Sequence, residues 1–263
     1  MVVACAVACA LAVMVAAALG SMVNSVAGGG TLLTFPALVW LGVPPLVANA
    51  TSTVALWPGA VSSMVGYRGR LRGLQRWALV FAMPSLAGGA VGAWLLLRTP
   101  AARFEQIVPW LVLGATLLFA VQGPLTRRLQ AGATAQDAGV FAPRHGAAAL
   151  TCQFLVGVYG GYFGAGIGIL MLAVLGFMGF SDIHRMNGLK NWGGLCMNFV
   201  AAAMFAFSGI VDWTVAIAMA TGAIGGGYLT ARIAQRVPQP LVRRGIIVIG
   251  VASGMWLLWA PLS

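Results

Sequence analysis

Long apolar stretches recur along the whole chain and are separated by short polar or basic stretches. In the first half they fall near residues 2–27, 31–48, 50–67, 76–97 and 105–122. In the second half they fall near residues 146–165, 169–183, 189–208, 213–234 and 244–260. Most of them approach the roughly 20 residues that an α-helix needs to cross a bilayer. The pattern predicts an all-α polytopic membrane protein with about ten hydrophobic segments, and the shorter stretches 31–48 and 169–183 are either full spans or half-helices.

The two sets of segments are related by one constant offset. Asn49 matches Asn187 (187 − 49 = 138). The same offset joins six further pairs of residues, namely Gly28 and Gly166, Gly30 and Gly168, Gly88 and Gly226, Gly89 and Gly227, Arg98 and Arg236, and Pro100 and Pro238. A single offset that joins several residue types predicts an internal duplication. We therefore divide the chain into a first transmembrane repeat, 1–122, a linker, 123–145, and a second transmembrane repeat, 146–263.

The basic residues predict that the two repeats have opposite orientations. The loop after the third segment carries Arg68, Arg70, Arg72 and Arg76, whereas its counterpart near 208–213 carries Asp212 and no base. The next loop carries fewer bases in the first repeat than in the second, which has Arg232, Arg236, Arg243 and Arg244. The positive-inside rule then gives inverted repeats of about five segments each, a cytoplasmic linker and two outer termini.

Composition excludes several classes of protein. The chain is 60% hydrophobic and only 7% charged, whereas a soluble domain carries roughly a quarter charged residues. The net charge of +11 lies in loops rather than in a basic and aromatic stripe, so we expect no nucleic acid as a partner. The sequence has no nucleophile–base constellation, P-loop or metal-ligand cluster, so we predict no enzymatic activity, no cofactor and no metal site. The tryptophans, Trp57 among them, fit interface belts or core packing.

Each repeat holds a glycine-rich junction, NSVAGGGTLLTFP at 24–36 and GVYGGYFGAGIGIL at 157–170. A glycine-rich break in a helix exposes backbone N–H groups to an anion and frees the backbone geometry. Broken helices are also where transporters bind their substrates. The candidate binding residues are Gly28, Gly29, Gly30, Gly164 and Gly166, and the alternative is that these glycines only let helices pack closely.

Each repeat also holds a polar junction, ANATST at 48–53 and MNGLKN at 186–191. The second contains Lys190, the only lysine of the chain. A cation from one repeat and neutral donors from the other suit a small oxyanion. The candidate ligands are Asn49, Thr51, Ser52, Asn187, Lys190 and Asn191. The alternative for Lys190 is an ammonium that snorkels to the interface, and nearby Asp182 either pairs with Arg185 or serves proton coupling.

These junctions resemble those of the TauE/SafE sulfite exporter family. The resemblance rests on AGGGTLLTFPAL and LGVPPLVANATST in the first repeat. In the second repeat it rests on GAGIGILMLAVL and RMNGLKNWGGLCMNFVAAAMFAFSGIVDW. It covers essentially the whole chain, although the stretch GYFGAGIGIL is less regular than a plain GxGGG run.

The resemblance implies a secondary transporter of small anions in the bacterial inner membrane. Members are associated with sulfite, sulfoacetate, related organosulfonates and other small organic anions. We therefore expect a small anionic substrate, a lipid bilayer around the protein and transport by alternating access. The alternatives are an anion channel with the same site and a permease for small carboxylates. A homo-oligomer stays open, as does coupling to protons or another ion.

Overall fold

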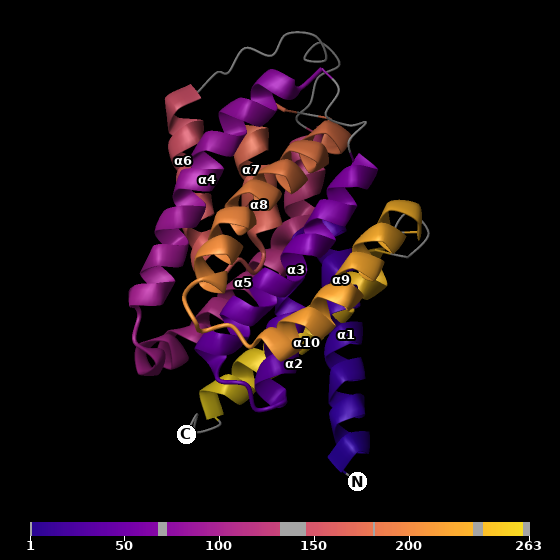
Figure 1. Cartoon of the computed structure of the whole chain (residues 1–263). Helices are drawn as coiled ribbons and strands as arrows, with labels where there is room; N and C mark the ends of the chain where they lie inside the picture. Colours follow the sequence, from indigo (N-terminus) through magenta and orange to yellow (C-terminus); the bar gives the residue numbers. More distant parts are fainter. Residues whose placement is uncertain (1, 68–72, 132–145, 181, 234–238, 260–263) are drawn as a thin grey trace.

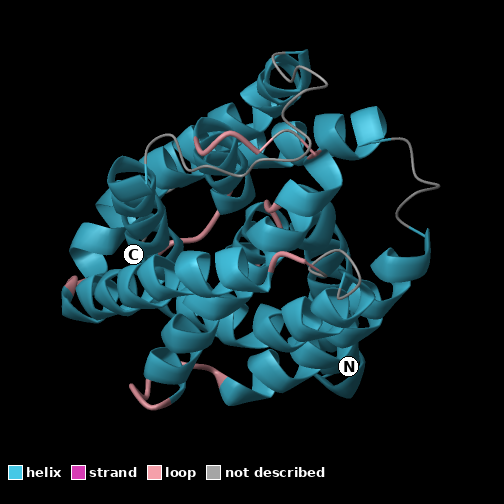
Figure 2. Ribbon diagram, turned by 90° about the horizontal axis from the view of Figure 1, so that it is seen from above, coloured by secondary structure: helices cyan, strands magenta, loops and turns pink. Residues whose placement is uncertain are grey.

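The computed structural model describes residues 2–67, 73–131, 146–180, 182–233 and 239–259, which form ten helices and no strand (Figures 1 and 2). The first half contains α1 (Val2–Ala27), α2 (Thr31–Trp40), α3 (Pro45–Tyr67), α4 (Gln75–Arg98) and α5 (Ala101–Ala131). The second half contains α6 (Gly146–Tyr162), α7 (Ile167–Phe177), α8 (Ile183–Ala206), α9 (Trp213–Ile233) and α10 (Gln239–Trp259). Each predicted apolar segment therefore contains one helix, and the all-α prediction is confirmed.

Two of the helices are much shorter than a bilayer-spanning helix and end well before the ends of the predicted segments to which they correspond. Helix α2 has 10 residues and α7 has 11, so at about 1.5 Å per residue each is roughly 15 Å long, half the thickness of a hydrocarbon core. The segment predicted at 31–48 ends as a helix at Trp40, because Gly42 takes φ +84° and a proline pair follows it. The segment predicted at 169–183 ends at Phe177, before Gly179 at φ +90°.

The outer surface of the described helices is apolar. Leu79 and Met83 on α4 are about 70% exposed, as is Trp110 on α5 at 65%. Within the described residues, the stretches Val7–Ser25, Gln75–Arg98 and Ala101–Val121 are long and apolar enough to cross a membrane. Large exposed side chains of this kind are disfavoured in water and suit a lipid environment.

The offset found in the sequence also relates the first residues of three pairs of helices. Helices α3, α4 and α5 begin at residues 45, 75 and 101, and α8, α9 and α10 begin at 183, 213 and 239. The three differences are the same (183 − 45, 213 − 75 and 239 − 101 all equal 138). The two halves therefore share one pattern of elements, as an internal duplication requires.

Packing between the halves is reciprocal. Helix α4 packs on α6 and α8, and its counterpart α9 packs on α1 and α3. A Cβ on Gly89 would lie 2.6 Å from the carbonyl oxygen of Met197, and one on Gly227 would lie 2.4 Å from that of Gly59. Gly227 is the equivalent of Gly89, and Gly59 is the equivalent of Met197, by the same offset (227 − 89 = 197 − 59 = 138). Glycine is needed at both places because the helices approach too closely for any side chain.

Some predictions fall on parts of the chain that are not described. The predicted linker 123–145 begins inside α5, which continues to Ala131, and residues 132–145 lie outside the described residues. The arginines at 68–72, 144 and 236, on which the predicted orientation depends, also lie outside them. In Figure 1 the first residues of α1 and the last residues of α10 lie at the same end of the molecule.

Two neighbouring glycines on α9 test the close packing. A Cβ on Gly226 would lie 2.2 Å from the carbonyl oxygen of Ala18, whereas one on Gly225 would meet nothing within 4 Å. We expect Gly226→Ala to lower stability by about 1–3 kcal/mol, the usual cost of overpacking. Gly225→Ala should leave it unchanged or raise it by about 0.5–1 kcal/mol, since alanine is the better helix former. Thermal unfolding of the purified variants in detergent measures both, and equal melting temperatures would contradict this account of the α1–α9 contact.

Candidate functional site

The chain is broken twice in the middle of the protein, between α1 and α2 and between α6 and α7. Gly28 follows α1 with φ +75°, and its N–H donates to the carbonyl groups of Asn24 and Val23 at 3.0 and 3.2 Å. Gly164 follows α6 with φ +78° and donates to the carbonyl of Tyr159 at 3.1 Å. These are glycine terminations of the kind that close helices, and they satisfy carbonyl groups that the last turn leaves without partners.

The two breaks touch each other. A Cβ on Gly28 would lie 2.4 Å from the Cα atom of Gly168, and the N–H of Gly168 points at the carbonyl oxygen of Gly28 at 3.5 Å. Of the other predicted glycines, Gly29 packs against the ring of Phe119 and Gly30 against the backbone of Gly20. Gly166 precedes α7 with φ +74°. The glycines therefore make the breaks and their contact, and their role as anion ligands stays a prediction.

Polar side chains from each half cap the broken helix of the other half. The Asn49 Nδ2 of α3 donates to the carbonyl oxygen of Tyr162, the last residue of α6, at 2.9 Å. The Lys190 Nζ of α8 donates to the carbonyl oxygen of Ser25, near the end of α1, at 3.4 Å. Lys190 is 2% exposed, so its ammonium lies inside the protein and does not snorkel to the interface. A cation suits this position because helix C-termini carry partial negative charge.

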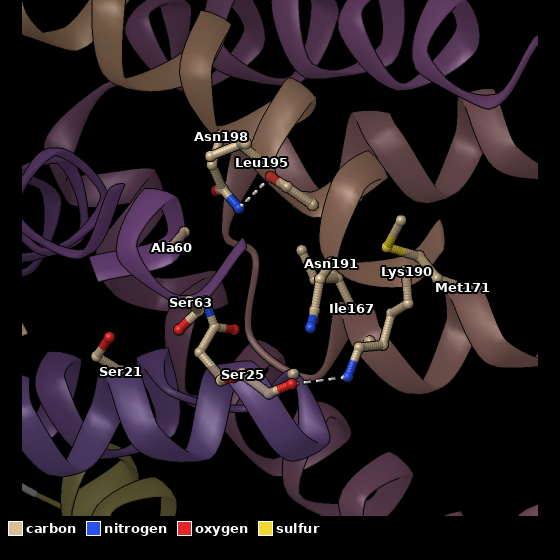
Figure 3. A pocket seen from close by; sticks show the side chains of 14 residues that line it. Ser21, Ser25, Ala60, Ser63, Ile167, Met171, Lys190, Asn191, Leu195 and Asn198 are labelled. Atoms are coloured by element: carbon tan, nitrogen blue, oxygen red, sulfur yellow. Dashed lines mark hydrogen bonds between the residues drawn. The ribbon is translucent and has the colours of Figure 1, made fainter. Parts of the chain in front are cut away.

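Lys190 lines a cavity, here called the lysine cavity, between α1, α3, α7 and α8 (Figure 3). The volume of the cavity is about 30 Å³, which is enough for about two water molecules. Its lining includes no carboxylate among the described residues. The residues that line it are Ser21, Asn24, Ser25, Gly28, Ala60, Ser63, Ile167, Gly168, Met171, Lys190, Asn191, Gly194, Leu195 and Asn198.

Three polar atoms around this cavity are buried without a hydrogen-bond partner in the described part of the chain. They are the Ser25 Oγ, the Ser63 Oγ and the Asn191 Nδ2. Buried polar groups are almost always paired, so each such atom calls for an explanation. All three can donate a hydrogen bond. In Figure 3, Asn191 and Lys190 extend from one side toward Ser25 and Ser63. The cavity thus brings one cation and three unused donors together.

A second cavity, here called the tryptophan cavity, adjoins the first. The volume of this second cavity is about 20 Å³. The two cavities have four lining residues in common, Asn24, Ala60, Ile167 and Asn198. The residues that line only the tryptophan cavity are Thr31, Thr53, Leu56, Trp57, Phe163 and Gly164.

The predicted site residues divide between these cavities and the surrounding packing. Gly28, Lys190 and Asn191 line the lysine cavity, and Gly164 lines the tryptophan cavity. Seven predicted residues line neither of them, namely Gly29, Gly30, Asn49, Thr51, Ser52, Gly166 and Asn187.

Three of these seven have structural partners in other helices or loops. One is Asn49, which donates to the carbonyl oxygen of Tyr162. The Ser52 hydroxyl lies 2.6 Å from that of Thr34, and the Thr51 hydroxyl accepts from the N–H of Asp212 at 3.1 Å. These hydroxyl groups hold α3 against α2 and against the start of α9.

Sequence reasoning missed several residues that line the lysine cavity. Ser21, Asn24 and Ser25 lie in the last turns of α1, and the latter two are the first residues of the first glycine-rich junction. Ser63 on α3 and Asn198 on α8 complete the polar lining. The sequence did contain a pattern that could have identified Ser63. Thr53, Trp57, Ala60 and Ser63 follow one another at spacings of three and four residues, so they share a helical face.

Asp182, directly before α8, and Arg185, in its first turn, form an exposed ion pair. The Arg185 Nε lies 3.5 Å from the Asp182 Oδ2, and the side chains are 44% and 51% exposed. The pairing expected from the sequence is therefore confirmed.

The capping role of Asn49 yields a prediction. Asn49→Ala should lower stability by about 1–3 kcal/mol, because it leaves the buried carbonyl of Tyr162 without that donor. Asn187→Ala is the matched control, since Asn187 is the equivalent residue of the second repeat and its Oδ1 is already buried without a partner. The substitution Asn187→Ala should therefore leave the free energy of unfolding almost unchanged. Thermal unfolding of both variants checks this, and a larger loss for Asn187→Ala would show that the capping account is wrong.

Comparison with known proteins agrees with these features. The family model described as sulfite exporter TauE/SafE matches residues 13–257. Three relatives, each 28% identical, are described as probable membrane transporter proteins. The ORF9 protein of a Sinorhizobium species aligns over 94% of this chain and 91% of its own length. The Haemophilus influenzae protein aligns over 87% and 86%, and the Escherichia coli protein YfcA over 92% and 87%.

No solved structure matches the chain significantly. The family model nonetheless spans both glycine-rich breaks, both polar junctions and every helix that lines the two cavities. This protein therefore belongs to the TauE/SafE sulfite exporter family of membrane transporters.

Proposed function

We propose that this chain is a secondary transporter of a small sulfur oxyanion such as sulfite, and that the anion binds in the lysine cavity. The observation that carries the proposal is the gathering of the buried Lys190 ammonium and three unused donors around one cavity. An anion with several oxygens accepts from such a set, and the ammonium offsets its charge. A cation substrate would find no carboxylate among the described residues that line this cavity.

The backbone adds to the attraction for an anion. Ile167 and Gly168 form the first turn of the half-helix α7, and both line the lysine cavity. The start of a helix carries partial positive charge and unpaired N–H groups. Half-helices that aim their N-termini at an anionic group are a recurring feature of transporters.

The size of the cavity favours a compact oxyanion over an extended organosulfonate such as sulfoacetate. The lysine cavity holds only about two water molecules in the described conformation. Small carboxylates share the oxygens and charge of sulfite, so a carboxylate permease is the second candidate.

Alternating access by two inverted repeats is part of the proposal. One supporting observation is the reciprocal packing of α4 and α9. Another is that the first helices of the two halves begin at opposite ends of the molecule. In Figure 1, α1 begins at the lower end of the molecule and α6 begins at the upper end. A multi-pass helical protein of this kind belongs in the bacterial inner membrane, since outer-membrane proteins are β-barrels. The energy would come from an ion gradient or from the gradient of the substrate itself.

Lys190→Met tests the proposal, since it keeps an unbranched side chain of similar size and removes its charge. We expect uptake of radiolabelled sulfite into proteoliposomes to fall about 10- to 100-fold, the usual value of a hydrogen bond to a charged group. Arg185→Met is the matched control, because it also removes one cation from α8 but from an exposed site. It should leave uptake within about twofold of the wild type.

The outcomes separate the candidates. If the wild type takes up formate or acetate but does not take up sulfite, the result would favour the carboxylate permease. Equal uptake by Lys190→Met and the wild type, with both eluting as folded protein, would remove the lysine cavity from the transport path.

A further inference from the structure

The tryptophan cavity repeats the wall of the lysine cavity with residues of the opposite half. Leu195 lines the lysine cavity, and Trp57 lines the tryptophan cavity at the equivalent position (195 − 57 = 138). Asn191 and Thr53 form a second such pair, and Gly194 and Leu56 form a third. The internal duplication has therefore built the same wall twice, once from α8 and once from α3.

The two copies meet at residues that are equivalent to each other. Ala60 and Asn198 differ by the same offset (198 − 60 = 138), and both line both cavities. If a pseudo-twofold axis relates the two repeats, it exchanges Ala60 and Asn198. Two exchanged residues that line the same space lie on either side of that axis. The two cavities thus adjoin at Ala60 and Asn198, where each half of the chain contributes one of two equivalent residues.

The copies differ in their chemistry. The equivalent of Lys190 is Ser52, which bonds Thr34 and does not line the tryptophan cavity. Trp57 instead contributes a buried indole Nε1 that has no acceptor in the described part of the chain. Its ring packs beside that of Phe199, with centroids 5.4 Å apart. A buried, unpaired N–H held in place beside a cavity is a donor without a protein partner.

We infer that the tryptophan cavity is a second binding station for the same anion, on the opposite side of the membrane from the lysine cavity, and that the Trp57 N–H is its donor. The inference rests on the proposed transport of a small anion. The anion leaves Lys190, passes Ala60 and Asn198, and is held by Trp57 and the hydroxyl groups of Thr31 and Thr53. A neutral station binds more weakly than a charged one, so it releases the anion easily.

Trp57→Phe tests the donor, because phenylalanine keeps an aromatic ring and removes the N–H. We expect sulfite counterflow to fall about tenfold or more, whereas equilibrium binding of radiolabelled sulfite to the purified protein stays within about twofold, since Lys190 is untouched. Trp110→Phe is the control for loss of an indole, as Trp110 faces outward at 65% exposure. Counterflow at the wild-type rate would overturn the inference, as would a loss of binding that matches the loss of rate.

A second measurement does not depend on the substrate. Thr53→Cys and Asn191→Cys are introduced singly into a chain whose four native cysteines are replaced by alanine and that still elutes as folded protein. A membrane-impermeant thiol reagent is then applied to right-side-out and to inverted vesicles. The equivalent positions should react from opposite sides, and reaction of both from the same side would overturn the inference. If the wild type moves no sulfite but the cysteines react from opposite sides, the proposed substrate fails while the two-station path stands.

Discussion

A helix that stops inside a membrane protein must find donors for its last carbonyl groups, because neither lipid nor a dry interior supplies them. The structure meets this constraint twice, by the same exchange between halves. Asn49 donates to the end of α6, and Lys190 donates to the end of α1. Each break is thus stabilised by the other repeat, and the two glycine junctions are brought into contact where α1, α3, α7 and α8 meet.

The same exchange explains why the lone lysine lies where it does. A buried charge is costly unless it has partners, and the partially negative end of α1 is one such partner. Ser52 occupies the equivalent position in the first repeat, where a short hydroxyl bonds only its neighbour Thr34. The long side chain of Lys190 reaches from that position into the cavity, where a serine would not. Two positions with the same place in the helix pattern therefore differ in charge and in the direction of their contacts.

Sequence analysis predicted the elements better than the directions in which their side chains point. The hydrophobic pattern and the offset located all ten helices of the described residues, because both reflect local periodicity and covalent spacing. Asn49, Thr53, Trp57 and Ala60 follow one another at spacings of four, four and three residues, so they share one face of α3. Only the last three line a cavity, whereas Asn49 donates to the end of α6. Periodicity tells which residues share a face, but which of them meet a cavity depends on how α3 packs against other helices, which no local pattern encodes.

The unequal charge of the two cavities fits the energetics of transport. A carrier must bind its substrate strongly enough to desolvate it and weakly enough to release it. A second lysine at Ser52 would add another costly buried charge and would hold the anion equally tightly at both ends of the path. In the proposed path, a charged station beside a neutral one avoids both problems, since the cation captures the anion and the neutral donors release it easily. Two equivalent scaffolds with one lysine between them therefore suit a carrier better than either two lysines or none.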